Sequence, residues 1–133
     1  YIREGSSIRQ GLEKMQRHGY TCLPVISKDG RFLGCINEGD FLWNILSMGS
    51  VTTKDMERAR IDDIISDRYT PVRVTTTMEE LLRHATEQNF VPVVDDRDIF
   101  MGIVTRRALL TYCLKNGVET ESLPTAEYVR RES

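Results

Sequence analysis

Residues 24–42 read PVISKDGRFLGCINEGDFL, and residues 92–110 read PVVDDRDIFMGIVTRRALL. The two stretches align without a gap at an offset of 68 residues. Five positions are identical in the two stretches: proline at 24 and 92, valine at 25 and 93, phenylalanine at 32 and 100, glycine at 34 and 102, and leucine at 42 and 110. A repeat of this length indicates two copies of one supersecondary unit, and it predicts that a binding site lies where the copies meet.

The first copy is predicted to form a strand, a helix, a hairpin and a second helix. Residues 7–10, Ser-Ile-Arg-Gln, fit a capping box, in which two side chains satisfy free N–H groups at a helix start. Residues 23–26 and 32–36 are predicted strands of the hairpin, after which Asn37 can cap the second helix. Its apolar residues are expected to face inward: Phe41, Leu42, Ile45 and Leu46.

The second copy shows the same order of elements. Residues 77–80, Thr-Met-Glu-Glu, suggest another capping box. Residues 91–94 and 99–104 are the predicted strands of the hairpin, and Thr105 can cap the helix that follows. This helix repeats the apolar pattern of its counterpart, with an expected inward face of Leu109, Leu110, Cys113 and Leu114.

The repeat divides the chain into segments. They are a first motif at 1–47, a polar connector at 48–60, a second motif at 61–115 and a tail at 116–133 that we expect to lie outside the core and to be mobile. The second motif should begin with a helical turn at 61–65 and a short strand at 72–74. The strand that should open the first motif ends near Ile2, so we expect this strand to be truncated and preceding native residues to be absent.

Composition limits the possible functions. The 133 residues are 40% hydrophobic and 29% charged, which is ordinary for a globular protein, and the net charge of −2 gives no basic excess for nucleic acid. No apolar run approaches the roughly 20 residues that cross a bilayer, so no membrane insertion is predicted. The three cysteines, Cys22, Cys35 and Cys113, are odd in number and lack CxxC spacing, which favours reduced thiols in the cytoplasm.

With strand–helix–strand–strand–helix present twice, the chain resembles a tandem pair of CBS domains, the Bateman module. The family's motifs are represented by LPVI and GCINEGD in the first copy and by VPVV and GIVTRRA in the second. QNFVPVVDD and IVTRR also look like small stand-alone bacterial CBS pairs, including cyclic di-AMP binders. The resemblance implies an α+β fold of two β-α-β-β-α motifs with pseudo-twofold symmetry and small sheets packed against helices.

The resemblance also implies where a nucleotide binds. The start of a helix suits a phosphate, and a carboxylate three residues further on can accept ribose hydroxyls. The first copy has Asn37 at the phosphate position and Asp40 at the ribose position. The second copy has Thr105 at the phosphate position but Ala108 in place of the acid. Asp40 could also be a first-turn acid that only complements the helix dipole.

Arg106 and Arg107 follow Thr105 and are unfavourable for the helix dipole, so a bound anion explains them better than a surface role. We therefore expect one principal site, in which Asp40 holds the ribose and Arg106 or Arg107 approaches the phosphate across the twofold axis. The base pocket is expected at Tyr20, Thr21, Cys22 and Ile36. A second pocket, empty or specific for something other than a ribose, is expected at Tyr69, Thr70, Pro71, Asn89 and Phe90.

Other chemistry has weaker support. His18 and His84 lack further ligands at a readable spacing, so no metal site is predicted. Residues 95–98 supply three aspartates, which we interpret as a solvated hairpin turn and not as a cation site. Trp43 has two open interpretations, an exposed anchor at a dimer interface or an ordinary half-buried tryptophan.

The leading hypothesis is a cytoplasmic regulatory module that binds an adenine nucleotide, AMP, ADP, ATP or cyclic di-AMP, and requires no cofactor. It is expected to form a homodimer and to signal the bound state to an unidentified partner protein. An alternative is the regulatory fragment of a larger enzyme or transporter. A small hydrolase or transferase is less favoured, because no nucleophile–base pair, P-loop or metal-ligand set is readable, so no catalytic residue is predicted.

Overall fold

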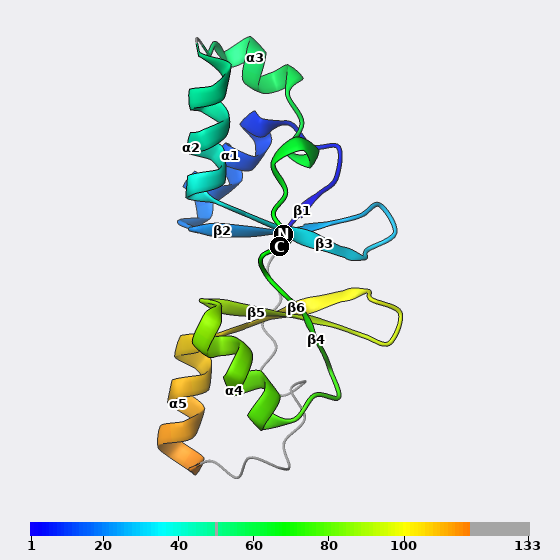
Figure 1. Ribbon diagram of the computed structural model, residues 1–133, viewed down its shortest axis with the longest axis vertical. Helices are drawn as coiled ribbons and strands as arrows, with labels where there is room; N and C mark the ends of the chain where they lie inside the picture. Colours follow the sequence, from blue (N-terminus) through cyan, green and yellow to red (C-terminus); the bar gives the residue numbers. More distant parts are fainter. Residues whose placement is uncertain (50, 118–133) are drawn as a thin grey trace. The chain divides into compact units, whose positions relative to one another are not determined.

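The computed structural model describes residues 1–49 and 51–117. They divide into two compact units, one of residues 1–29 and 33–68, the other of residues 30–32 and the described residues from 69 onward. Each unit has a three-stranded sheet with helices on one face of it (Figure 1). The predicted α+β class is confirmed. Most of the predicted mobile tail, residues 118–133, lies outside the described residues.

The first unit begins with the predicted order of elements, and it also contains the helical turn that the sequence predicts at the start of the second motif. It contains β1 (Ile2–Arg3), α1 (Ile8–His18), β2 (Cys22–Ile26), β3 (Phe32–Asn37), α2 (Glu38–Met48), α3 (Thr53–Arg58) and the 3₁₀-helix η1 (Ile61–Ile64). The sheet order is β1-β2-β3, and β1 runs parallel to β2 with Ile2 opposite Val25. Because parallel strands need a crossover, α1 connects them and is carried onto one face of the sheet.

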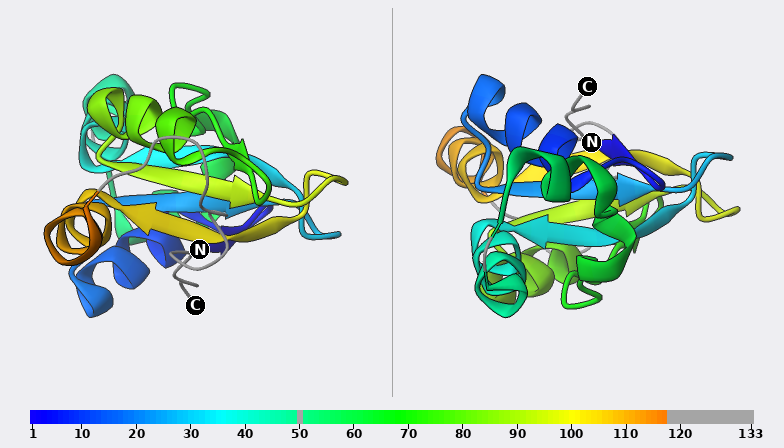
Figure 2. Two further views of the ribbon diagram at one scale, coloured as in Figure 1. Left: turned by 90° about the horizontal axis from the view of Figure 1, so that it is seen from below. Right: turned by 90° about the horizontal axis from the view of Figure 1, so that it is seen from above.

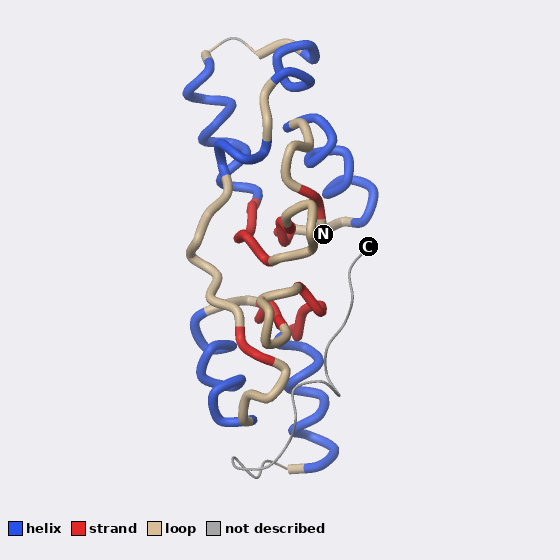
Figure 3. Tube along the Cα trace, turned by 90° about the vertical axis from the view of Figure 1, so that its right-hand side faces the viewer, coloured by secondary structure: helices blue, strands red, loops and turns tan. Residues whose placement is uncertain are grey.

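The second unit repeats this arrangement. It contains β4 (Val72–Arg73), α4 (Met78–Glu87), β5 (Phe90–Val94), β6 (Phe100–Thr105) and α5 (Arg106–Asn116). β4 runs parallel to β5, and β5 pairs antiparallel with β6. Figure 1 shows α4 and α5 on the same side of the sheet, and the views onto the sheet show β5 and β6 running side by side (Figure 2). The tube view shows strands and helices in separate layers within each unit (Figure 3).

Capping residues start the helices where the sequence predicts. Ser7 forms the complete capping box with Gln10, and Gly19 ends α1 in the left-handed conformation at φ +67°. In the second unit only half of the predicted box is present, since Thr77 Oγ1 accepts from Glu80 N–H at 3.2 Å. The Glu80 carboxylate lies 3.9 Å from Arg83 on the next turn of α4.

Each unit has its own apolar core between sheet and helices. The core of the first unit consists of Ile2, Ile8, Met15, Leu23, Val25, Ile36, Phe41 and Ile61. The core of the second consists of Val72, Met78, Leu81, Ala85, Val91, Val93, Val104 and Leu109. The corresponding positions of the repeat, such as Phe41 and Leu109, therefore have the same role in their own units.

The predicted inward faces of α2 and α5 are partly wrong. Phe41 and Leu109 are 2% exposed, but Leu42 is 61% and Leu46 is 70% exposed. Their counterparts Leu110 and Leu114 are likewise exposed. Successive helical residues point about 100° apart, so Leu42 and Leu46 lie on a face turned away from the one that Phe41 presents to the core. Trp43 is also exposed, so it is not a half-buried tryptophan within the part of the chain that the structure describes.

The chain that leaves η1 passes along β3. Cys35 N–H donates to Ser66 O at 3.0 Å, and Ser66 N–H donates to Cys35 O at 2.9 Å. Gly34 permits this approach, because a Cβ there would lie 2.5 Å from Ser66 O. Within the described residues, no helix is long and apolar enough to cross a membrane.

Candidate functional site

The predicted ribose residue lies at the junction of β3 and α2. Asn37 ends the strand and caps the helix, with its Oδ1 accepting from Asp40 N–H at 2.8 Å. Asp40 Oδ2 accepts in return from Asn37 N–H at 2.9 Å. The two residues therefore form a capping box, which fixes the first turn of α2 and holds the carboxylate beside free helical N–H groups.

Arg68 completes this cluster and is a residue that the sequence analysis missed. Its Nη2 donates to Asp40 Oδ1 at 3.0 Å, and its Nε donates to Ser66 Oγ at 2.8 Å. The Arg68 side chain is 59% exposed and that of Asp40 is 19% exposed. No sequence signal could identify this pairing, because Arg68 lies 28 positions from Asp40 and is not part of the short sequence stretches that carry the family resemblance.

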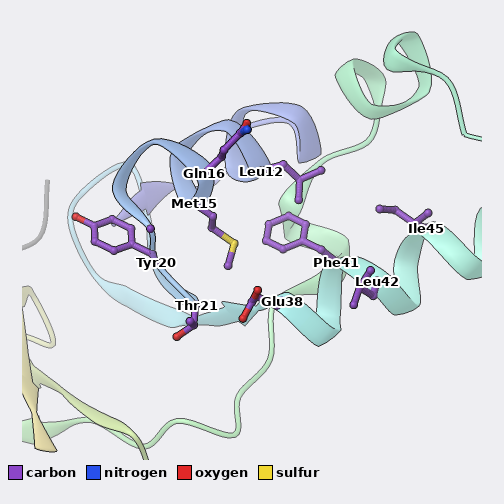
Figure 4. A pocket seen from close by; sticks show the side chains of 10 residues that line it. Leu12, Met15, Gln16, Tyr20, Thr21, Glu38, Phe41, Leu42 and Ile45 are labelled. Carbon is purple, nitrogen blue, oxygen red and sulfur yellow. The ribbon is translucent and has the colours of Figure 1, made fainter.

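A groove opens between α1 and α2 of the first unit, with a volume of about 410 Å³ (Figure 4). Its apolar end is lined by Leu12, Leu42 and Ile45. Its polar end is formed by Tyr20, Thr21 and Glu38, where Glu38 N–H donates to Thr21 O at 3.2 Å. The size lies in the range of small-molecule sites.

The predicted base pocket is only partly assembled in this groove. Tyr20 and Thr21 line it, whereas Cys22 is 8% exposed and Ile36 is fully buried in the core of the first unit. Burial raises the pKa of the Cys35 thiol, with further contributions from a hydrogen bond with Cys22 and from the charge of Asp40. The Cys35 thiol therefore stays protonated and unreactive.

The two arginines after Thr105 differ in their contacts. Arg106 folds back on the end of α4, where its Nε donates to Ala85 O at 2.6 Å and its Nη2 to Thr86 O at 3.2 Å. It thus satisfies carbonyl groups at a helix C-terminus, where a positive charge is favoured. The Arg107 side chain is exposed and forms no hydrogen bond or ion pair with another residue among those described. Thr105 Oγ1 caps α5 by accepting from Ala108 N–H at 3.1 Å.

The predicted second pocket is a connected cluster in the second unit. The Tyr69 ring stacks on Phe90 at 4.8 Å, and its hydroxyl donates to Asn89 Oδ1. Gln88, which the sequence analysis did not single out, exchanges hydrogen bonds with the backbone of Thr70, at 3.0 and 3.2 Å. This buried amide ties the segment before β4 to the start of β5. Pro71 follows Thr70 and is half-buried.

In the aspartate-rich turn, carboxylates form hydrogen bonds and an ion pair with neighbouring protein groups. Asp95 Oδ1 accepts from Arg97 N–H at 2.8 Å and from Ile99 N–H at 3.0 Å, and Asp98 pairs with Arg73 at 3.3 Å. These contacts account for two of the three carboxylates. In the part of the chain that the structure describes, no group of three or more His, Cys, Asp or Glu side chains is placed to hold a metal ion.

Comparisons with known proteins agree on one family. The family described as "CBS domain" matches residues 1–47 and again residues 61–115. The chain is 28% identical over 105 residues to cystathionine beta-synthase of Dictyostelium discoideum, which covers 79% of this chain and 21% of that protein. It is 20% identical over 110 residues to cyclic di-AMP receptor B of Bacillus subtilis, covering 83% of this chain and 75% of the receptor. The chain thus spans about a fifth of the first relative's length.

Solved structures show the same fold. The Listeria monocytogenes CbpB protein in complex with c-di-AMP aligns with a TM-score of 0.75 at 23% identity, over 86% of this chain and 85% of that one. A CBS domain protein from Streptococcus pneumoniae aligns with a TM-score of 0.78 at 23% identity, over 86% of this chain and 77% of that one.

Proposed function

Because this chain belongs to the CBS-domain family, we propose that it is a regulatory module that binds an adenine nucleotide, AMP, ADP, ATP or cyclic di-AMP, and presents the bound state to a partner protein. The observation that carries the proposal is the polar cluster at the start of α2, where Asp40 is held between Asn37 and Arg68. It offers a fixed carboxylate for ribose hydroxyls. The bound nucleotide is released unchanged, so no catalysis is involved.

The ligand class draws further support from two relatives. One is named a cyclic di-AMP receptor, and the other was solved as a complex with c-di-AMP. In the first unit the proposed base contacts are Tyr20 and Thr21 at the polar end of the groove. In the second unit Thr105, Arg106 and Arg107 are proposed phosphate contacts. Of the two arginines, Arg107 has no side-chain hydrogen bond to break within the described residues, whereas Arg106 first has to leave Ala85 and Thr86.

Replacing Asp40 with asparagine is expected to weaken adenine-nucleotide binding by about 30-fold, since hydrogen bonds to a charged acceptor contribute about 1.5–3 kcal/mol. Asparagine retains one oxygen for the helix cap, so the fold should persist. The measurement is calorimetric titration with AMP, ADP, ATP and cyclic di-AMP, with GMP as the base control. The matched variant Asp63→Asn changes an exposed acid on η1 and should bind like the wild type.

The possible outcomes of this titration test the proposed function and the assignment of Asp40 to the ribose separately. If no adenine nucleotide binds or stabilises the wild-type protein, the proposed function fails. If binding survives Asp40→Asn unchanged, the function stands but the ribose assignment is wrong. Turnover of a bound nucleotide, followed by chromatography, would instead favour the hydrolase alternative.

We further propose that a second copy of the chain covers the exposed face of α2, giving a homodimer. Trp43 is 74% exposed, and with Leu42 and Leu46 it forms an apolar surface that continues into the apolar end of the groove. Large aromatic residues dominate the energy of such interfaces. This surface is the specific feature that a monomer leaves unexplained.

Replacing Trp43 with lysine is expected to weaken dimerisation by about 30-fold or more, because a central aromatic contact contributes about 2 kcal/mol or more. The measurement is sedimentation velocity over a concentration series. Leu33→Lys, at an exposed leucine on β3, is the matched control and should leave the dimer intact. A wild-type protein that stays monomeric at high micromolar concentration contradicts the proposal.

A second candidate is that the chain is the regulatory part of a larger enzyme or transporter. The observation in its favour is that the matched region makes up 21% of the Dictyostelium cystathionine beta-synthase. Nucleotide binding is expected under either candidate, so the two differ in the partner and not in the ligand site.

A further inference from the structure

We propose that Arg68 is the positioning residue for Asp40 and thereby sets a preference for ribonucleotides over 2′-deoxyribonucleotides. This inference rests on the proposed nucleotide function and adds to it a residue that the short stretches carrying the family resemblance do not include. The geometry that points to it is the pairing of Arg68 with the carboxylate from one side while the backbone of Asn37 holds it from the other.

Only half of the hydrogen-bond acceptor sites on the Asp40 carboxylate are used. Each carboxylate oxygen has two lone-pair sites, and one on each is used, by Arg68 Nη2 at 3.0 Å and by Asn37 N–H at 2.9 Å. Two hydrogen bonds at opposite oxygens fix the plane of the group. The remaining site on each oxygen is then directed at a fixed position, where ribose hydroxyls can donate.

Arg68 is itself held in place, which a positioning residue requires. Its Nε donates to Ser66 Oγ at 2.8 Å, and its own backbone N–H lies 3.3 Å from the same oxygen. Ser66 is anchored on β3 by the two hydrogen bonds with Cys35. The guanidinium is therefore connected to the sheet on one side and to the first turn of α2 on the other.

Stability alone does not account for this arrangement. Arg68 is 59% exposed, and an ion pair at such exposure contributes little to folding. The planar fork of arginine, by contrast, can join Ser66 and Asp40 at once, which the single ammonium of lysine does less well. The contact thus has the properties of an orienting contact more than of a stabilising one.

Arg68→Met is expected to weaken AMP binding by about tenfold, as for the loss of one charge-assisted hydrogen bond. Binding of 2′-deoxy-AMP, which keeps only the 3′-hydroxyl as a donor to Asp40, should weaken by a smaller factor of about threefold. Cyclic di-AMP and its 2′-deoxy analogue should differ in the same direction. Arg68→Lys keeps the charge without the fork and should also lose the preference. In the Asp40→Asn protein, Arg68→Met should have no further effect on the preference.

Arg73→Met is the matched control, because Arg73 is 53% exposed and pairs with Asp98 of its own unit, the second one. It should leave both affinities unchanged. Equal weakening of the ribo and deoxy ligands by Arg68→Met, or no change in either, overturns the assignment to Arg68. If the wild-type protein binds ribonucleotides and 2′-deoxyribonucleotides equally, the assignment to Arg68 is overturned while the nucleotide function stands. If it binds no adenine nucleotide, the assignment and the proposed function are both overturned.

Discussion

Replacing Phe41 with alanine is expected to lower the free energy of unfolding by about 3–5 kcal/mol. Phe41 is 2% exposed and lies in the core of the first unit. A Cβ on Gly11 would lie 2.9 Å from its ring, so α1 already approaches the ring as closely as it can. The substitution therefore leaves a cavity that the neighbouring helices fill poorly. Urea denaturation followed by far-UV circular dichroism measures the effect.

Leu42→Ala is the matched control for this prediction. Leu42 is the next residue of α2 but is 61% exposed, so its truncation should change the free energy of unfolding by less than about 0.5 kcal/mol. A loss at Leu42 that depends on protein concentration reports dimerisation and not folding. Equal, concentration-independent losses at the two positions would show that the orientation of α2 is wrong.

Gly34→Ala is expected to destabilise the first unit by about 3 kcal/mol. A Cβ at Gly34 would lie 2.5 Å from Ser66 O and 2.6 Å from Ile65 Cγ2, and the φ angle of +153° is itself unfavourable for alanine. To accommodate the methyl group, β3 and Ser66 must separate, which strains or breaks the two hydrogen bonds between Cys35 and Ser66. Thermal and urea unfolding both measure the loss.

Gly5→Ala separates the steric cost of the close approach at Gly34 from the conformational cost of a positive φ angle. Gly5 has a φ of +80°, but nothing lies within 4 Å of a Cβ built there. Its substitution has only the conformational cost, about 1 kcal/mol. Losses of the same size at Gly5 and Gly34 would mean that the close approach of Ser66 contributes nothing.

The fold could be predicted because its signals are local and occur twice. Capping residues, hairpin turns and short apolar strands each depend on neighbours in the sequence, and the second copy tests the first. The orientation of α2 and α5 could not be predicted in full. Leu42 and Leu46 are apolar whether they face the core of the unit or an outer surface, and sequence pattern alone does not separate the two.

The candidate site was predictable only where the family motif reaches. Asp40 and Asn37 lie together as the motif spacing implies, but Arg68 joins them through a contact that spans 28 residues. Arg106 and Arg107 are neighbouring residues of the same type, yet of these two only Arg106 donates to the carbonyls of Ala85 and Thr86. Such contacts depend on how separate segments pack, and no short pattern encodes them.

The bridge between Cys35 and Ser66 also bears on how the protein behaves when it is concentrated. An uncovered edge strand invites pairing with another chain, which leads to aggregation. At the outer edge of β3, Ser66 takes the hydrogen bonds of Cys35 that an incoming strand would need. The opposite edge is β1, which is only two residues long. The segment around Ser66 therefore protects the sheet of the first unit against growth by strand addition, a task separate from any ligand.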